Sequence, residues 1–112
     1  MAEKTALQRK WELVKDWCER NGMEIKQVGH DVLHDYAAMN PEAAKGIGFK
    51  ACKDGELLHD SEPGFERRVK NMGHEIHEYR QMKGNGHVYW PAHLAALDFE
   101  NASVETWEKE LK

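Results

Sequence analysis

The spacing of apolar residues constrains the fold of this chain more than any other feature of its sequence. Apolar side chains recur every three or four positions, which places them along one face of an α-helix. The first such stripe, within residues 3–21, consists of Leu7, Trp11, Val14, Trp17 and Cys18. It predicts a helix that ends at Asn21-Gly22, because glycine commonly follows the last helical turn.

The same rule predicts further helices along the rest of the chain. A second stripe predicts a helix over residues 25–39, followed by a short helix that begins at Pro41. The longest stripe predicts a helix over residues 65–82. Two last helices are expected to begin at Pro91 and after Ser103, since these residue types are frequent at helix starts.

Helices of this length with short connections predict an all-α fold, a compact bundle of four to five helices. The chain has 112 residues, enough to bury one core, so we expect a single domain over residues 1–112. Residues 46–60 carry no clear helical pattern. Residues 87–90 have a strand-like composition and could add a minor two-stranded element near 87–90.

The charge balance and the shortness of the apolar runs argue against several classes of function. The chain has 20 acidic and 16 basic residues in mixed order, so nucleic-acid binding is not expected. No apolar run approaches the roughly eighteen residues that span a membrane, and no secretory signal is recognised at the start. Cys18 and Cys52 are expected to be reduced core residues. We therefore expect a cytoplasmic protein without membrane contact.

Seven histidines are present, and five of them are followed directly by an acidic residue. Two pairs have helical spacing, His30 with His34 and His74 with His77, so the members of each pair can reach one ion. If the helices that carry them pack together, these four imidazoles could bind zinc or another divalent transition metal. An acidic neighbour could complete the site: Asp31, Asp35, Glu75 or Glu78.

A metal held in this way could activate water, with Asp31 or Glu75 as a ligand or base. This is the alternative hypothesis, a divalent-metal-dependent hydrolase of phosphate esters or nucleotides. The run His74-Glu75-Ile76-His77 differs from the zinc-protease pattern His-Glu-x-x-His, because its second histidine comes one residue early. That difference turns the second side chain by about 100° around the helix. The simpler interpretation is that these histidines lie on solvated helix faces.

An aromatic corner supports the favoured hypothesis. Tyr89 and Trp90 stand beside Pro91 and close to His87 and His93. Exposed aromatic residues often anchor protein interfaces or stack on planar ligands. The sequence has no nucleophile motif and no phosphate-binding glycine loop. We therefore expect a small noncatalytic binding or regulatory protein without a cofactor, of the kind that phages and mobile elements encode as inhibitors, which recognises a protein or a small ligand.

Two further expectations concern DNA and assembly. Residues 17–31 can be aligned with a helix-turn-helix, but Lys26 would be the only firm cation of its second helix. A helix-turn-helix DNA-binding protein is therefore the third hypothesis. A homo-oligomer would also suit a bundle of this size, because association supplements a limited core.

Overall fold

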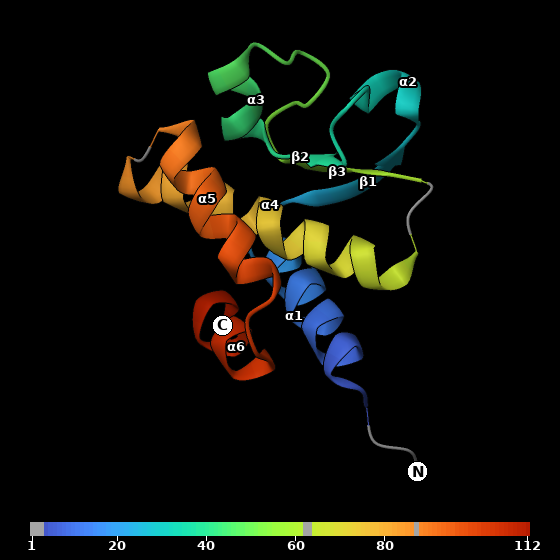
Figure 1. Ribbon diagram of the computed structural model, residues 1–112, viewed down its shortest axis with the longest axis vertical. Coiled ribbons are helices and arrows are strands. Elements are labelled where there is room, and N and C mark those ends of the chain that lie inside the picture. Colours follow the sequence, from blue (N-terminus) through green and yellow to red (C-terminus); the bar gives the residue numbers. More distant parts are fainter. Residues whose placement is uncertain (1–3, 62–63, 87) are drawn as a thin grey trace.

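The computed structural model describes residues 4–61, 64–86 and 88–112. These residues form a mostly helical fold with a small three-stranded sheet (Figure 1). In chain order the elements are α1 (Ala6–Arg20), β1 (Glu24–Val28), α2 (His30–Leu33), β2 (Ala38–Met39), α3 (Pro41–Ile47), β3 (Glu56–Asp60), α4 (Phe65–Asn85), α5 (Tyr89–Glu100) and α6 (Val104–Leu111). The prediction of a mostly helical fold is confirmed, and that of an all-α bundle is corrected by the sheet.

Helices α1, α3 and α6 each begin after a residue whose side chain caps the first turn. Thr5 caps α1, because its hydroxyl accepts a hydrogen bond from the Gln8 N–H and the Gln8 side chain accepts one from the Thr5 N–H. Asn40 caps α3, with Pro41 as its first residue, and Ser103 caps α6. These bonds satisfy backbone groups that the first helical turn leaves free. The helices predicted from Pro41 and after Ser103 are therefore confirmed.

The helix predicted over residues 25–39 is replaced by β1, the one-turn helix α2 and β2. Ile25 and Val28 are three residues apart, and in a strand an odd spacing puts side chains on opposite faces. The core consists of two clusters of buried residues, one shared with α1 and α4 and one with α3. Ile25 packs against the first cluster and Val28 against the second. The same spacing therefore also suits a strand that is covered on both faces. In the helix-turn-helix alignment of the third hypothesis, residues 24–28 of the second helix are thus strand β1.

The two-stranded element predicted near residues 87–90 does not form in the described part of that segment. Helix α5 begins at Tyr89 with Val88 as its N-cap residue, and His87 lies outside the described residues. Pro91 fits the first turn of this helix, where its missing N–H costs no hydrogen bond. A strand does form within residues 46–60, the segment that carries no clear helical pattern: β3 occupies residues 56–60 of it.

Strand β3 is the centre of the sheet, whose order is β1-β3-β2. It pairs in parallel with β1 and antiparallel with β2. The adjacent residues Leu57 and Leu58 of β3 belong to different core clusters, the first shared with α1 and α4 and the second with α3. Figure 1 shows α4 and α1 on one side of the sheet and α2 and α3 on the other. Strand β2 is left as an edge strand in contact with α4.

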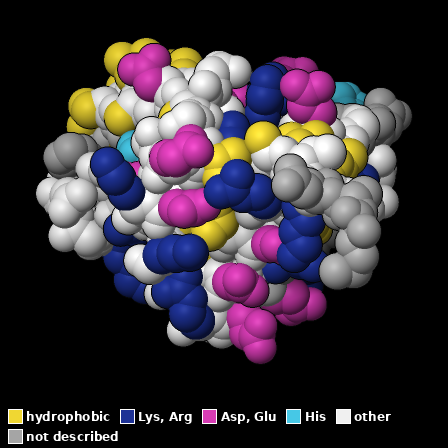
Figure 2. All heavy atoms as spheres, turned by 90° about the horizontal axis from the view of Figure 1, so that it is seen from below, with side chains coloured by type: hydrophobic (Ala, Val, Ile, Leu, Met, Phe, Trp, Pro, Cys, Tyr) yellow, Lys and Arg dark blue, Asp and Glu magenta, His cyan; other side chains and the backbone are white. Residues whose placement is uncertain are grey.

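The C-terminal helices complete the core on the side of α1 and α4. Helix α5 packs along α4, and α6 packs against α1. On the face seen in Figure 2, basic and acidic side chains are intermixed, and apolar side chains occupy small areas between them. Among the described residues, no helix is both long and apolar enough to cross a membrane.

Candidate metal centre

Helix α4 buries four polar side chains in the part that packs against neighbouring elements. Asn71, His74, Glu75 and Glu78 are each less than a tenth exposed to solvent. The spacings of three and four put Asn71, His74 and Glu78 in one row on the helix surface. Charged groups are seldom buried without partners, so this row must satisfy its polar atoms inside the fold.

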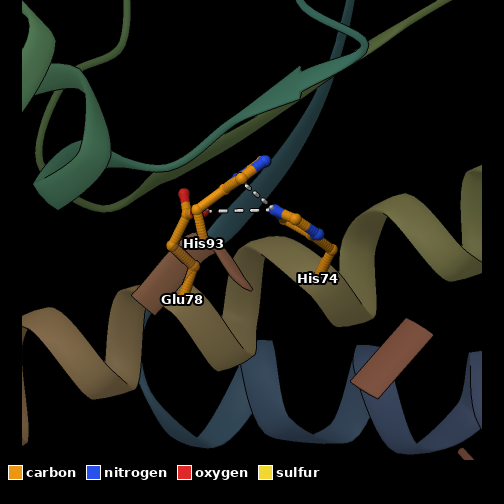
Figure 3. Close-up of side chains that lie close together, drawn as sticks. All are labelled: His74, Glu78 and His93. Atoms are coloured by element: carbon orange, nitrogen blue, oxygen red, sulfur yellow. Dashed lines mark hydrogen bonds and ion pairs between the residues drawn. The ribbon is translucent and has the colours of Figure 1, made fainter. Parts of the chain in front are cut away.

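Three atoms of metal-ligand type converge between α4 and α5 (Figure 3). Nε2 of His74 lies 3.1 Å from Oε2 of Glu78 and 3.1 Å from Nδ1 of His93. The Glu78 and His93 atoms are themselves 2.9 Å apart. Ligand atoms about 2.0–2.1 Å from a tetrahedral zinc ion lie roughly 3.3 Å from one another. This ligand triangle, formed by His74, Glu78 and His93, therefore needs only a small expansion to accept an ion.

Glu100 holds the His74 ring from its other side. Nδ1 of His74 donates to Oε2 of Glu100 at 2.9 Å, and this bond fixes the ring with Nε2 facing Glu78 and His93. Arg67 forms an ion pair with the same carboxylate. Histidines that bind metals usually donate their second ring N–H to a carboxylate, a carbonyl or water. His74 thus has the outer support that metal-binding histidines usually have.

Asn40 places a fourth polar group beside the triangle. Its Nδ2 atom donates to Oε1 of Glu75 and to Oε1 of Glu78, each at 3.0 Å. Its Oδ1 atom accepts from the Ala43 N–H at the start of α3, so the amide is fixed in one orientation. The second oxygen of Glu75, Oε2, lies 3.9 Å from Nε2 of His74. Glu75 is therefore adjacent to the ligand atoms without being one of them.

The cluster holds more carboxyl groups than guanidinium groups, and it retains protons that offset the difference. Glu75, Glu78 and Glu100 line the same cavity as one guanidinium, that of Arg67. Burial, and then the charge of Glu78, raises the pKa of Glu75 to about 8. Burial disfavours the charged form of His74, but hydrogen bonds to Glu100 and Glu78 outweigh this and raise its pKa to about 10. A bound divalent cation would displace the protons that these groups retain.

A cavity of about 470 Å³ adjoins the ligand triangle, and all three of its residues line the wall. This volume is within the usual range for small-ligand sites. The rest of the wall comes from β2 and the segment before it, from α4 and from α5, and includes Tyr36, Ala38, Asn71, Trp90 and Leu97. A molecule in this cavity would lie within reach of an ion held by the triangle.

Of the four histidines predicted as ligands, only His74 belongs to the ligand triangle. His77 stacks on Phe99 with ring centroids 4.7 Å apart, and its Nδ1 has no hydrogen-bond partner among the described residues. Burial lowers the pKa of this imidazole. His30 and His34 are exposed, the first in α2 and the second directly after it. The described structure does not bring these three histidines to the triangle.

The residues predicted for catalysis and binding are also divided by the fold. Asp31 is exposed in α2, whereas Glu75 stands beside the triangle. Tyr89 stacks on His93 with ring centroids 5.3 Å apart, and Trp90 meets the same ring edge-on at 5.8 Å. The aromatic corner and the histidine cluster, which the sequence suggests as separate features, therefore belong to one site.

From the sequence, Glu78 was one of several acidic residues expected to complete a metal site, but His93 was not predicted as a metal ligand. A usable signal was the spacing of His74 and Glu78 at four residues, with Glu75 directly after the histidine. Zinc accepts carboxylate oxygens, so this pattern matches the helical arrangement of His-Glu-x-x-His with one ligand exchanged. No local pattern could supply the residues from other elements: Asn40, His93 and Glu100.

Comparisons with known proteins add no relative from which a function could be transferred. No protein-family model, no curated protein and no solved structure matches the chain.

Proposed function

We propose that this chain is a metal-dependent hydrolase. His74, Glu78 and His93 would bind the metal, and Glu75 would act as the general base. The observation that supports this most directly is the ligand triangle, whose atoms lie 2.9 to 3.1 Å apart, with a further carboxylate beside it. Three protein ligands leave the fourth position of a tetrahedral ion for water, as in catalytic zinc sites.

The donor set favours zinc or a similar divalent transition metal. Imidazole nitrogen suits zinc, iron, copper and nickel, whereas magnesium and calcium prefer oxygen ligands. Two of the three atoms in the triangle are imidazole nitrogens, from His74 and His93. The single carboxylate ligand, Glu78, is compatible with zinc, which binds histidine and glutamate together in several hydrolases.

The order of groups along α4 supports the assignment of the base. In the helical pattern His-Glu-x-x-His, the two histidines bind zinc and the glutamate acts as the base. Here His74 and Glu78 occupy the two ligand positions, and Glu75 occupies the position of the base. His93, from α5, would supply the third ligand.

Hydrolysis would use Glu75 as a carrier of one proton. A bound metal lowers the pKa of its water from about 15.7 to about 7. Glu75 would take that proton while the water oxygen bonds to the electrophilic atom of the substrate. The bond to the leaving group would then break, and the proton would pass from Glu75 to that group. Asn40 holds one oxygen of Glu75 and leaves the other for this transfer.

Metal content is the first test. Untagged protein incubated with zinc and then desalted is expected to retain about one ion per chain. His93→Ala and Glu78→Ala should lose it, whereas His34→Ala, which changes an exposed histidine outside the triangle, should keep it. Native mass spectrometry measures the ion, and circular dichroism verifies that each variant is folded. Absence of zinc, or equal retention by all four proteins, would overturn the proposal.

Activity is the second test, and Glu75→Gln separates binding from chemistry. The zinc-loaded protein would be screened against peptides, carboxylic esters and phosphate esters, with and without a chelator. Glu75→Gln is expected to retain zinc but to lose at least about 100-fold in rate, a common cost of removing a general base. Equal rates in the wild type and in Glu75→Gln would refute the role of Glu75.

A noncatalytic binding protein is the second candidate. The observation that favours it is the exposure of Trp90, at 66%, in contact with the site. Such a protein would bind a partner through this corner whether or not Glu75 is present. Full partner binding by the wild type, without turnover of any substrate class, would favour this candidate over the hydrolase.

A further inference from the structure

We infer that the substrate is a peptide in extended conformation, which pairs with the open edge of β2 and places an apolar side chain against Trp90 and Leu97. This inference rests on the proposed hydrolase and specifies its substrate class. Three independent features of the cavity support it: an unpaired strand edge, a buried donor without a partner, and an exposed apolar surface.

The strand edge comes from the pairing of β2. In an antiparallel ladder, residue pairs alternate between those that exchange backbone hydrogen bonds and those that do not. Asp60 donates its N–H to the Ala37 carbonyl, and Ala38 and Met39 stand opposite His59 and Leu58. The N–H and C=O of Ala38 therefore point away from β3, on the side where no described strand lies. An extended chain can add to such an edge through its backbone.

The buried donor is the amide of Asn71. This side chain is 7% exposed, and its Nδ2 atom has no hydrogen-bond partner among the described residues. Asn71 precedes His74 by one turn of α4 and lines the same cavity. A buried amide donor is expected to have an acceptor. A turn of the amide toward the cavity would bring Nδ2, which is covered in this structure, to the carbonyl of a peptide bond placed at the metal.

The apolar surface lies on α5. Trp90 and Leu97 line the cavity with exposures of 66% and 43%, and they are seven residues apart, on one side of the helix. Tyr36, at 40%, lies in the wall on the β2 side. Exposed large apolar side chains beside a cavity commonly mark a recognition site. An apolar substrate side chain would cover this surface.

The lack of a free basic side chain favours a peptide over a phosphate ester. Among the described residues that line the cavity, Arg67 is the one arginine or lysine, and its guanidinium is already paired with Glu100. A phosphate group would therefore find no unpaired arginine or lysine beside the ion to bind its oxygens. The backbone of a peptide is uncharged and needs none.

The hydrolysis then has a defined outcome. The water oxygen bonds to the carbonyl carbon of the peptide, the carbon–nitrogen bond breaks, and the proton carried by Glu75 goes to the amine that leaves. The products are one carboxylic acid and one amine, and water is the only reactant consumed.

The test measures peptide binding and cleavage separately. The probe is a capped, fluorescein-labelled hexapeptide with two central leucines. Two control peptides carry central aspartates or N-methyl groups on alternate amides, which block strand pairing. With zinc-loaded Glu75→Gln, anisotropy is expected to show at least about tenfold tighter binding of the leucine peptide than of either control. The zinc-loaded wild type is expected to cut the leucine peptide.

Variants of the cavity wall test two of the features, the apolar surface and the buried donor. Leu97→Asp should weaken binding of the leucine peptide at least about fivefold, and Leu94→Asp should leave it unchanged, because Leu94 is exposed on the same helix but does not line the cavity. Asn71→Ala should weaken binding, with partial recovery in Asn71→Gln. Circular dichroism verifies folding in each case.

Failure of this inference can be distinguished from failure of the proposed function. Equal binding of all three peptides, or cleavage of phosphate esters but of no peptide by the zinc-loaded protein, would overturn the peptide assignment and leave the hydrolase. A protein that binds the leucine peptide selectively but takes up no zinc would overturn the hydrolase and support the peptide-binding edge.

Discussion

Glu100 supports the site without contributing to the ligand triangle. Glu100→Gln keeps the shape of this side chain but removes the charge that holds the His74 ring. We expect zinc affinity to fall by about 10–100-fold, the usual effect of losing such a partner. Competition with a chelator measures the change. Glu108→Gln is the matched control, because Glu108 pairs with Arg9 away from the triangle. An equal loss in both variants would contradict the role of Glu100.

The two cysteines are also defined by their surroundings. Cys18 is 3% exposed and Cys52 is 8% exposed, which confirms the prediction that both are core residues. Burial raises the pKa of each thiol to about 12. At pH 8 both thiols are therefore protonated in the folded protein, and the thiolate is the form that reacts.

We expect iodoacetamide to modify neither cysteine of the folded protein during the time in which a free thiol reacts fully. In guanidinium chloride the pKa values return to their ordinary range, and both residues should react. Intact mass after timed quenching measures the number of modified thiols. Modification of either cysteine at the rate of a free thiol, without denaturant, would show that this thiol is accessible to solvent.

Among the secondary-structure elements, the contact between α4 and α6 depends on Gly73. A Cβ atom at this position would lie 2.1 Å from Cη2 of Trp107, a fully buried side chain. Gly73→Ala gains about 1 kcal/mol of helix propensity. Overpacking against a rigid indole costs about 1–3 kcal/mol or more. We expect the free energy of unfolding to fall, by up to about 2 kcal/mol, as measured by urea denaturation.

Gly84 provides the matched control in the same helix. A Cβ atom there would meet nothing within 4 Å. Gly84→Ala should therefore raise the free energy of unfolding by about 0.5–1 kcal/mol, through helix propensity and a more restricted unfolded chain. If Gly73→Ala were as stabilising as Gly84→Ala, the tight contact with Trp107 would be refuted.

For the whole molecule, a bound ion would link α4 to α5 and balance the buried carboxylates. A ligand at 100 times its Kd adds about 2.7 kcal/mol to the free energy of unfolding. For a chain of this size we expect zinc to raise Tm by roughly 10 °C, and a chelator to reverse the shift. Differential scanning calorimetry measures it. His93→Ala should show no shift and His30→Ala the full shift, since His30 is exposed in α2. A zinc effect of the same size in both variants would place the ion elsewhere.

The sequence by itself determined those helices whose signals, such as the spacing of apolar residues, lie within one or two helical turns. The stripe from Leu7 to Cys18 is sufficient to predict α1, because it joins side chains that are neighbours in the helix. The long stripe that begins at Phe65 is sufficient for α4 in the same way. The spacing of Asn71, His74 and Glu78 also places them on one face of α4, but the prediction paired His74 with His77 instead.

Only the tertiary structure decided the sheet and the complete site. The spacing of Ile25 and Val28 suits a helix or a strand, and pairing with β3, far along the chain, selected the strand. His93 reaches His74 because α5 packs along α4, and Asn40 reaches Glu75 because α3 starts beside the edge strand. Such contacts join residues that no local period connects, and the burial that drives them exceeds the small differences in local propensity.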